Sequence, residues 1–303
     1  MSGNTTIHDN FIRSILANKK IALTYLKNYL PASVSKRLNL TQLPDTYLSE
    51  DLKKSISDIV YSCQRKDSEQ TLKVCLLIEH KSYPDKYTPV QIGAYIFSAL
   101  QKQVQNNEPL SLVIPVLLYH GKGRWQYRTL AGLFDHLDDE WKQYLPGFEY
   151  IYNDLGTLSD EQVKALNDKF LAASILALKH SFEKEWIERN AVQLLLLAGE
   201  GPKGLQKGFI IYLYSRGKLN EKILDSLPVS IKSTIMNTLD IYIEKGRKEG
   251  MEKGIEKGME KGKELVVGNL LAASKFTLSE IANFAGVTEA FVKKVRTTLK
   301  KNK

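Results

Sequence analysis

The hydrophobic positions in the first half of the chain form short continuous runs separated by polar segments. The clearest run is VCLLIEHK at residues 74–81, and similar runs lie at 57–66, 110–119 and 149–152. Continuous apolar runs of this length are typical of strands that are covered on both faces. Because the polar link at 67–70 is short, the runs at 57–66 and 74–81 are predicted to form a hairpin.

Helical spacing of apolar residues dominates the rest of the chain. Residues 6–38, 88–105 and most of the chain from Ser159 onward show this pattern. Pro89 suits the first turn of the helix at 88–105. The predicted buried stripe of that helix consists of Val90, Ala94, Phe97, Leu100 and Val104. Together the patterns predict an α/β fold followed by a helical C-terminal extension.

Residues 246–264 differ from the rest because they repeat glycine every four positions in GRKEGMEKGIEKGMEKGKE. Each glycine costs a helix about 1 kcal/mol relative to alanine, so an isolated helix here would be marginal. The repeat is either a linker or an oligomerisation helix whose glycine stripe lets another helix approach closely. We therefore expect four segments: a core at 1–158, a helical extension at 159–245, the repeat at 246–264 and a basic helix pair at 265–303.

The C-terminal helix pair resembles a helix-turn-helix unit, whose second helix can enter a DNA major groove. Thr277 or Ser279 would cap the first helix, Gly286 would end it, and Thr288 would cap the second. Helical hairpins of this length are also common packing units, so the pattern leaves both interpretations open.

Positive charge concentrates in the same place. The chain has a formal net charge of +9, and residues 292–303 hold six basic residues and no acidic ones. A basic tail is often a solvated helix end, but it can also contact DNA phosphates. The candidate DNA-binding residues are Lys293, Lys294, Arg296, Lys300 and Lys301.

The chain shows no signal-like segment at its N-terminus, and its longest apolar runs fall far short of the roughly 20 residues that span a bilayer. We therefore expect a soluble, cytoplasmic protein without a membrane partner. Cys63 and Cys75 are too few for a disulfide framework. If Asp58, Glu79 and Lys81 share one face of an unbulged antiparallel hairpin, Cys63 and Cys75 fall on opposite faces. Both are therefore expected to be free, buried thiols.

The end of the run at 74–81 carries the candidate chemistry. Strand side chains alternate, so Glu79 and Lys81 project to one face and His80 to the other. Asp58, at the start of the preceding strand, would lie opposite them in the hairpin. Two carboxylates can hold a divalent cation, usually Mg²⁺. The ammonium group of Lys81 can position an attacking water or offset charge on a phosphate.

An Asp followed by a spaced Glu-x-Lys resembles the PD-(D/E)xK nuclease superfamily. Further segments make the chain similar to the recombination-promoting nuclease/putative transposase (Rpn) family: IHDNFIRSIL with His8 and Asp9, IEHKS at 78–82, QIGAYI with Gln91 and Tyr95, and IPVLLYHGKGRW at 114–125. The resemblance implies a restriction-endonuclease-like α/β fold, in which a mixed sheet is flanked by helices. It also implies a DNA endonuclease that uses Mg²⁺ or Mn²⁺ and a link to recombination, mobile elements or phage defence.

The resemblance further implies roles for single residues. Asp58 and Glu79 would hold the metal, Lys81 would position water and Gln91 would support the site. His8 and Asp9 lie near the active site in the family, although a helix N-terminus would equally explain the carboxylate.

Two further alternatives stay open at this stage. His120 fits a turn after a strand better than a catalytic role. The competing function is a DNA-binding or regulatory protein with a catalytically weak nuclease fold, which would act through its C-terminal helices and as a homo-oligomer.

Overall fold

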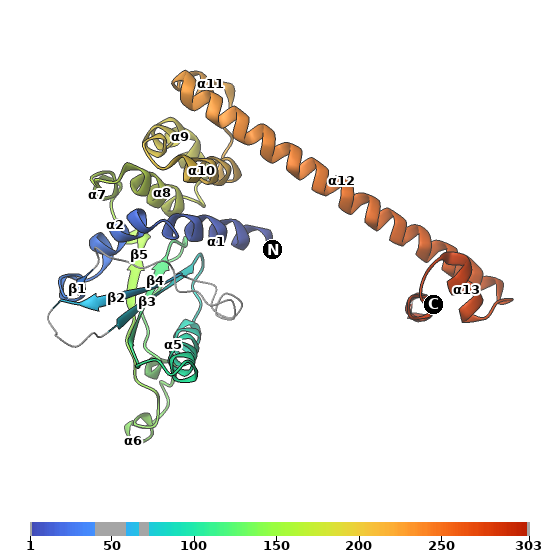
Figure 1. Ribbon diagram of the computed structural model, residues 1–303, viewed down its shortest axis with the longest axis horizontal. Coiled ribbons are helices and arrows are strands. Elements are labelled where there is room, and N and C mark those ends of the chain that lie inside the picture. The colour runs from blue at the N-terminus through green and yellow to red at the C-terminus, as the bar shows by residue number, and fades with distance from the viewer. Residues whose placement is uncertain (1, 40–58, 67–72, 302–303) are drawn as a thin grey trace. The chain divides into compact units, whose positions relative to one another are not determined.

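One five-stranded sheet organises the first part of the protein (Figure 1). The computed structural model describes residues 2–39, 59–66 and 73–301. The strands lie side by side in chain order: β1 (Leu38–Asn39), β2 (Ile59–Arg65), β3 (Lys73–Lys81), β4 (Leu112–Tyr119) and β5 (Ile151–Asp154). β1, β2 and β3 pair antiparallel, whereas β3, β4 and β5 pair parallel. The predicted α/β fold with a mixed, helix-flanked sheet is confirmed.

The antiparallel pair of β2 and β3 has the register that the alternation of side chains predicts. Ile59 pairs with Ile78, and Cys63 pairs with Val74. Since Ser62 pairs with Cys75, positions 63 and 75 lie on opposite faces of the sheet. Cys63 is a buried thiol. The side chain of Cys75 and the link at 67–72 lie outside the described residues.

Pro115 lies within β4, as the sequence predicts, and it occupies a position that is paired on one side only. Leu77 of β3 is its partner. Pairing with β5 begins one residue later, between Val116 and Ile151. A residue without an N–H is tolerated where a strand has such an open edge.

Helix α5 (Thr88–Gln105) has the predicted span, with Pro89 in its first turn, and covers one face of the sheet. Its Ile92 and Ile96 pack with Val113 and Leu117 of β4. The predicted buried stripe is wrong, because Val90, Phe97 and Val104 are about half exposed or more.

Two tertiary contacts select the face of α5 that is buried. Gly93 faces the Phe148 ring, and a Cβ added there would lie 3.0 Å from the ring carbon Cε1. Gln103 is buried, and its Oε1 accepts the backbone N–H of Ser111 at 2.6 Å. Helical spacing alone does not distinguish this stripe from the exposed one.

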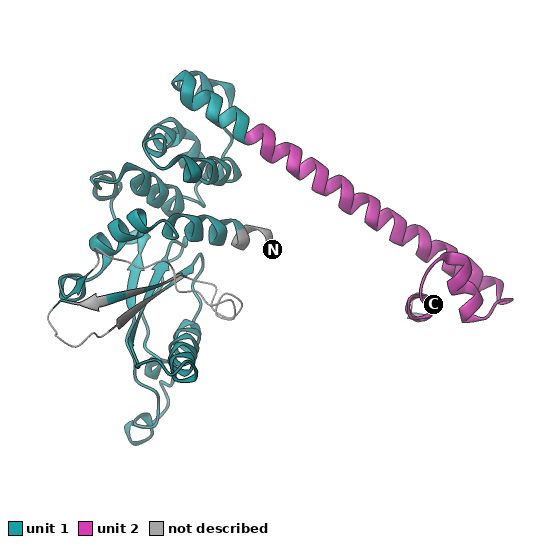
Figure 2. Ribbon diagram, in the orientation of Figure 1, with its two compact units in different colours: residues 1–238 teal, residues 239–303 magenta. Residues whose placement is uncertain are grey.

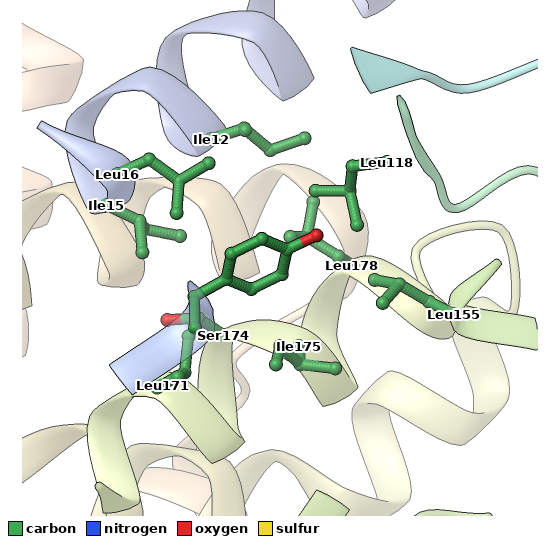
Figure 3. Close-up of a pocket in the computed structure, with 10 residues that line it drawn as sticks. Ile12, Ile15, Leu16, Leu118, Leu155, Leu171, Ser174, Ile175 and Leu178 are labelled. Atoms are coloured by element: carbon green, nitrogen blue, oxygen red, sulfur yellow. The ribbon is translucent and has the colours of Figure 1, made fainter. Parts of the chain in front are cut away.

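The opposite face of the sheet is covered by α1 (Ser2–Leu16), α2 (Lys19–Tyr29) and α8 (Lys169–Lys179). Figure 3 shows Ile12, Leu118 and Leu178 around a small cavity between these elements. The cavity has an almost entirely apolar lining and belongs to the core. The hydroxyl of Tyr61 on β2 donates to the carbonyl of Leu16, which ties the hairpin to α1.

Helices follow the sheet, as predicted from Ser159 onward. They are α7 (Asp160–Lys164), α8, α9 (Lys184–Gly199), α10 (Lys203–Arg216) and α11 (Glu221–Asp225). The shorter elements are α3 (Ala32–Ser35), η1 (Ala131–Leu133), α6 (Asp139–Lys142) and η2 (Leu155–Thr157). No helix in the described part of the chain is long and apolar enough to cross a membrane.

The chain divides into two compact units, residues 1–238 and 239–303 (Figure 2). The glycine repeat is helical and forms part of α12 (Val229–Ala273). A Cβ added at any glycine from Gly246 to Gly262 would meet no heavy atom of the described chain within 4 Å. The glycines of the repeat therefore face open space within the described part of the chain. In the repeat, Glu260 Oε1 lies 3.9 Å from Lys294 Nζ. The predicted division into four segments stays a prediction.

The second unit contains the predicted helix pair, α13 (Leu278–Ala285) and α14 (Glu289–Lys301). Thr277 caps α13 in a reciprocal capping box with Glu280, and Gly286 ends the helix with a positive φ of 59°. The hydroxyl of Thr288 accepts the N–H of Phe291. Val292 and Val295 of α14 pack with Ile281 and Val267 in a separate small core.

Candidate active site

Lys81 ends β3 with its ammonium group held at the side of the sheet that α5 covers. Its Nζ lies 2.6 Å from Gln91 Oε1 and 3.5 Å from Asp85 Oδ2. Its side chain is largely buried. The structure therefore brings together Lys81 and Gln91, two of the predicted site residues.

The loop between β3 and α5 explains this contact. Asp85 Oδ1 accepts the N–H of Tyr87, and Asp85 O accepts the N–H of Thr88. These bonds fix where α5 begins and so place Gln91 within its first turns, beside Lys81. Asp85 is a candidate site residue that the sequence pattern does not predict. Its position, four residues after Lys81, is the only signal that the sequence offers for it.

Glu79 lies two positions before Lys81 in the same unbroken strand. The partners of these residues in β4 are Leu117 and Tyr119, and Leu117 belongs to the core beneath α5. Positions 79 and 81 therefore share the α5 face. The structure describes the backbone of Glu79 and not its side chain.

Asp58 lies outside the described residues. Its chain neighbour Ile59 pairs with Ile78, the neighbour of Glu79. Within the described part of the chain, no three His, Cys, Asp or Glu side chains group to hold a metal ion. The predicted metal ligands are carboxylates, which suit Mg²⁺, and their convergence stays a prediction.

Asp9 contacts the other face of β3, and His8 lies on the same side, beside His120. The Nε2 of His80 lies 2.7 Å from Asp9 Oδ1, and since a carboxylate only accepts, His80 donates this hydrogen bond. His80 and Lys81 are consecutive in the strand, so their side chains lie on opposite faces of the sheet. The contacts described for Asp9 join it to His80 rather than to Lys81, and those of His8 join it to Tyr212, Arg216 and His120.

His8 is buried beneath the sheet and is held neutral. Its Nδ1 lies 2.8 Å from the Tyr212 hydroxyl, and Nη1 of Arg216 lies 3.3 Å from its Nε2. A guanidinium only donates, so Nε2 accepts and Nδ1 carries the proton. Burial, followed by the charge of Arg216, lowers the pKa of His8 from 6.5 to about 4. The neutral ring is a structural link between α1 and α10.

His120 lies beside His8 and His80 at the end of β4. Its ring centroid is 4.8 Å from that of His8 and 6.1 Å from that of Phe182. Neither ring nitrogen makes a hydrogen bond of normal geometry to any described residue. Burial, and then the nearby His8 and His80, lower the pKa of His120 well below its ordinary value, although the carbonyl groups of Leu178 and of His120 itself oppose this shift. The contacts of His120 are those of a packed core residue.

Comparison with known proteins identifies the family. The model of a family described as "Putative transposase, YhgA-like" matches residues 6–202. The chain belongs to this family. The YhgA-like match covers the whole sheet, Lys81 and Gln91, and it ends before α10, so the glycine repeat and the C-terminal helix pair lie beyond it.

Two curated relatives agree with this assignment and with the predicted Rpn family. Over 123 residues the chain is 29% identical to "Recombination-promoting nuclease RpnC" of Escherichia coli K12, covering 39% of this chain and 40% of the relative. Over 164 residues it is 24% identical to "Recombination-promoting nuclease RpnD" of Escherichia coli O157:H7, covering 52% of this chain and 62% of the relative. The matches therefore span less than two thirds of either relative. No solved structure matches the chain significantly.

Proposed function

We propose that this YhgA-like protein is a metal-dependent DNA endonuclease that hydrolyses phosphodiester bonds. The observation that carries the proposal is the short contact between Lys81 Nζ and Gln91 Oε1, at the end of a strand that also carries Glu79 two residues earlier. The names of the two relatives support nuclease activity and a link to recombination. We further propose that the protein acts in the cytoplasm and as a homo-oligomer.

Asp58 and Glu79 would hold Mg²⁺ or Mn²⁺, which supplies Lewis acidity to the phosphate and acidifies bound water. Lys81 has its ammonium group in a largely buried position, where a charge acts more strongly than in water. That group can orient a water molecule toward phosphorus or offset negative charge as it develops on the phosphate. The amide oxygen of Gln91 holds Lys81 in place for either task.

Divalent metal dependence is the direct test of this proposal. Purified protein is expected to nick or linearise supercoiled plasmid in the presence of Mg²⁺ or Mn²⁺ and to leave it intact in EDTA, because the proposed carboxylate ligands need the cation to act. The measurement is the conversion of supercoiled plasmid over time on agarose gels. Equal cutting with and without EDTA would contradict the metal-dependent mechanism.

One part of the competing function, DNA binding through the C-terminal helices, is supported by the charge of α14. The valines of α14 face the small core, whereas Lys293, Lys294 and Arg296 are exposed. The Thr277 cap, the turn at Gly286 and the second helix follow the order of elements in a helix-turn-helix unit, which supports the proposal. Lys300 and Lys301 stay candidate DNA-binding residues, and their side chains lie outside the described part of the chain. We propose DNA contact here as an addition to the nuclease site.

A chain that ends at Ile243 is expected to melt with the cooperativity of the full-length protein but to bind DNA more weakly. The truncated chain keeps the buried α12 residues Ile235 and Thr238 and loses only the second unit beyond its first few residues. Each lost phosphate contact should flatten the salt dependence of DNA binding by about one unit of slope. Calorimetry and fluorescence anisotropy at several salt concentrations measure these effects. Unfolding of the truncated chain would show that the second unit supports the first.

A further inference from the structure

Two adjacent loops follow β3 and β4 at the end of the sheet that carries Lys81. Residues 82–87, SYPDKY, lead from β3 to α5, and residues 120–124, HGKGR, follow β4. The N–H of His120 donates to Lys81 O at 3.1 Å. In open sheets, ligands bind at the carboxyl ends of parallel strands such as these.

Glycine allows the two loops to touch. A Cβ at Gly121 would lie 2.5 Å from Ser82 O and would also collide with the Tyr119 side chain. A Cβ at Gly123 would lie 3.8 Å from Pro84 Cγ. The loops therefore form one continuous surface beside the candidate active site, which we call the strand-end surface.

This surface exposes aromatic rings and positive charge. Tyr83 and Tyr87 are 56% and 57% exposed. Lys86 Nζ lies 4.7 Å from the centroid of the Tyr87 ring. Lys122 and Arg124 are also exposed. None of these three cations forms an ion pair with another described residue.

The two loops contain one carboxylate, that of Asp85, and its described contacts are not with the exposed cations. Asp85 accepts from the Tyr87 N–H and lies beside Lys81 Nζ. Its bonds also couple the surface to the site, because Asp85 contacts the candidate catalytic lysine and the backbone of an exposed tyrosine at once. The strand-end surface thus presents cations and aromatic faces next to Lys81.

We infer that the strand-end surface binds an unpaired stretch of DNA, with Tyr83 and Tyr87 stacking on bases while Lys86, Lys122 and Arg124 contact phosphates. Interleaved aromatic rings and cations are the means by which proteins hold single strands. In a duplex the faces of the bases are stacked on one another, so exposed tyrosines favour unpaired or frayed DNA. The inference rests on the proposed function and names the form of DNA that the same site takes.

Binding in EDTA tests this inference independently of cleavage. The full-length protein and its variants are titrated into fluorescein-labelled oligo-dT and into a duplex of the same length, and anisotropy gives both affinities. The double variant Tyr83→Ala/Tyr87→Ala is expected to lose at least about fivefold in single-strand affinity for each stack, or about 25-fold in total. Its duplex affinity should change far less.

Matched variants separate stacking from other effects. Tyr83→Phe/Tyr87→Phe keeps both rings and should bind oligo-dT as the wild type does. Tyr144→Ala removes a tyrosine that is 75% exposed outside this surface and should also change nothing. Exchanging Lys86, Lys122 and Arg124 for glutamine should flatten the salt dependence of oligo-dT binding by about 0.7 for each lost phosphate contact.

Two results would overturn the inference: an alanine double variant that binds oligo-dT unchanged, or one that loses single-strand and duplex affinity equally. Cleavage does not enter these measurements. Plasmid cutting without the selective loss would therefore reject the inference alone, whereas the selective loss without any plasmid cutting would reject the nuclease proposal alone.

Discussion

Lys81→Ala should lower plasmid cleavage by at least about a hundredfold, the usual minimum for loss of a positioned acid–base or charge-stabilising group. Lys81 is held by Gln91 at 2.6 Å, so its replacement by alanine removes an ammonium group from a fixed position at the candidate site. DNA binding should persist, because affinity comes mostly from phosphate contacts elsewhere.

Glu79→Gln should have an effect of the same size, since it keeps the shape of the side chain and removes the charge that would hold a divalent cation. The measurements are the initial rate of supercoiled plasmid loss in Mg²⁺ and the affinity for the same DNA in EDTA. Lys207→Ala, which changes an exposed lysine of α10, is the control and should cut at the wild-type rate. Undiminished cutting by Lys81→Ala or Glu79→Gln would show that other residues do the chemistry.

The free energy of unfolding should fall steeply between pH 6.5 and pH 4 because of the buried histidines. The folded state lowers the pKa of His8 from 6.5 to about 4, so the unfolded chain binds the proton first as the pH falls. The contribution of neutral His8 to the free energy of unfolding is therefore fully present above pH 6.5 and is lost as the pH falls toward 4. A difference of this size corresponds to about 3 kcal/mol for His8. His120, whose pKa is lowered in the same direction, adds to the loss.

His120→Phe should flatten this pH dependence and raise the stability at pH 5 by about 1 kcal/mol or more, since it replaces a buried imidazole without normal hydrogen bonds by an apolar ring. Urea unfolding midpoints at pH 7.5 and pH 5 measure both effects. His136→Phe changes an exposed histidine and should leave the pH dependence as it is. If the His120→Phe protein showed the same difference between the two midpoints as the wild type, His120 would not contribute to the pH dependence of stability.

Local patterns of the sequence determine much of the fold. The short polar link predicts that β2 and β3 pair. The alternation of side chains along β3 predicts which faces the paired residues share, because a slip of one residue would turn every side chain to the other face. Pro89 predicts where α5 begins, and Thr277 with Gly286 predicts both ends of α13. These features depend on residues close together in the chain, where backbone geometry and capping chemistry act.

The sequence likewise predicts some residues of the candidate site and not others. The alternation of residues in β3 places Glu79 and Lys81 on one face, and the family resemblance points to Gln91, which the structure places against Lys81. Asp85 escapes prediction because only the turn between β3 and α5 brings its carboxylate back toward the strand end.

The tertiary structure alone decides which apolar stripe of α5 is buried and on which side of the sheet His8 lies. α5 carries two apolar stripes with the same spacing, and the contact of Gly93 with Phe148 selects between them. His8 meets Tyr212 and Arg216, which are 204 and 208 positions away along the chain. Such contacts depend on how separate helices pack across the sheet, and the order of residues near His8 carries no signal of it.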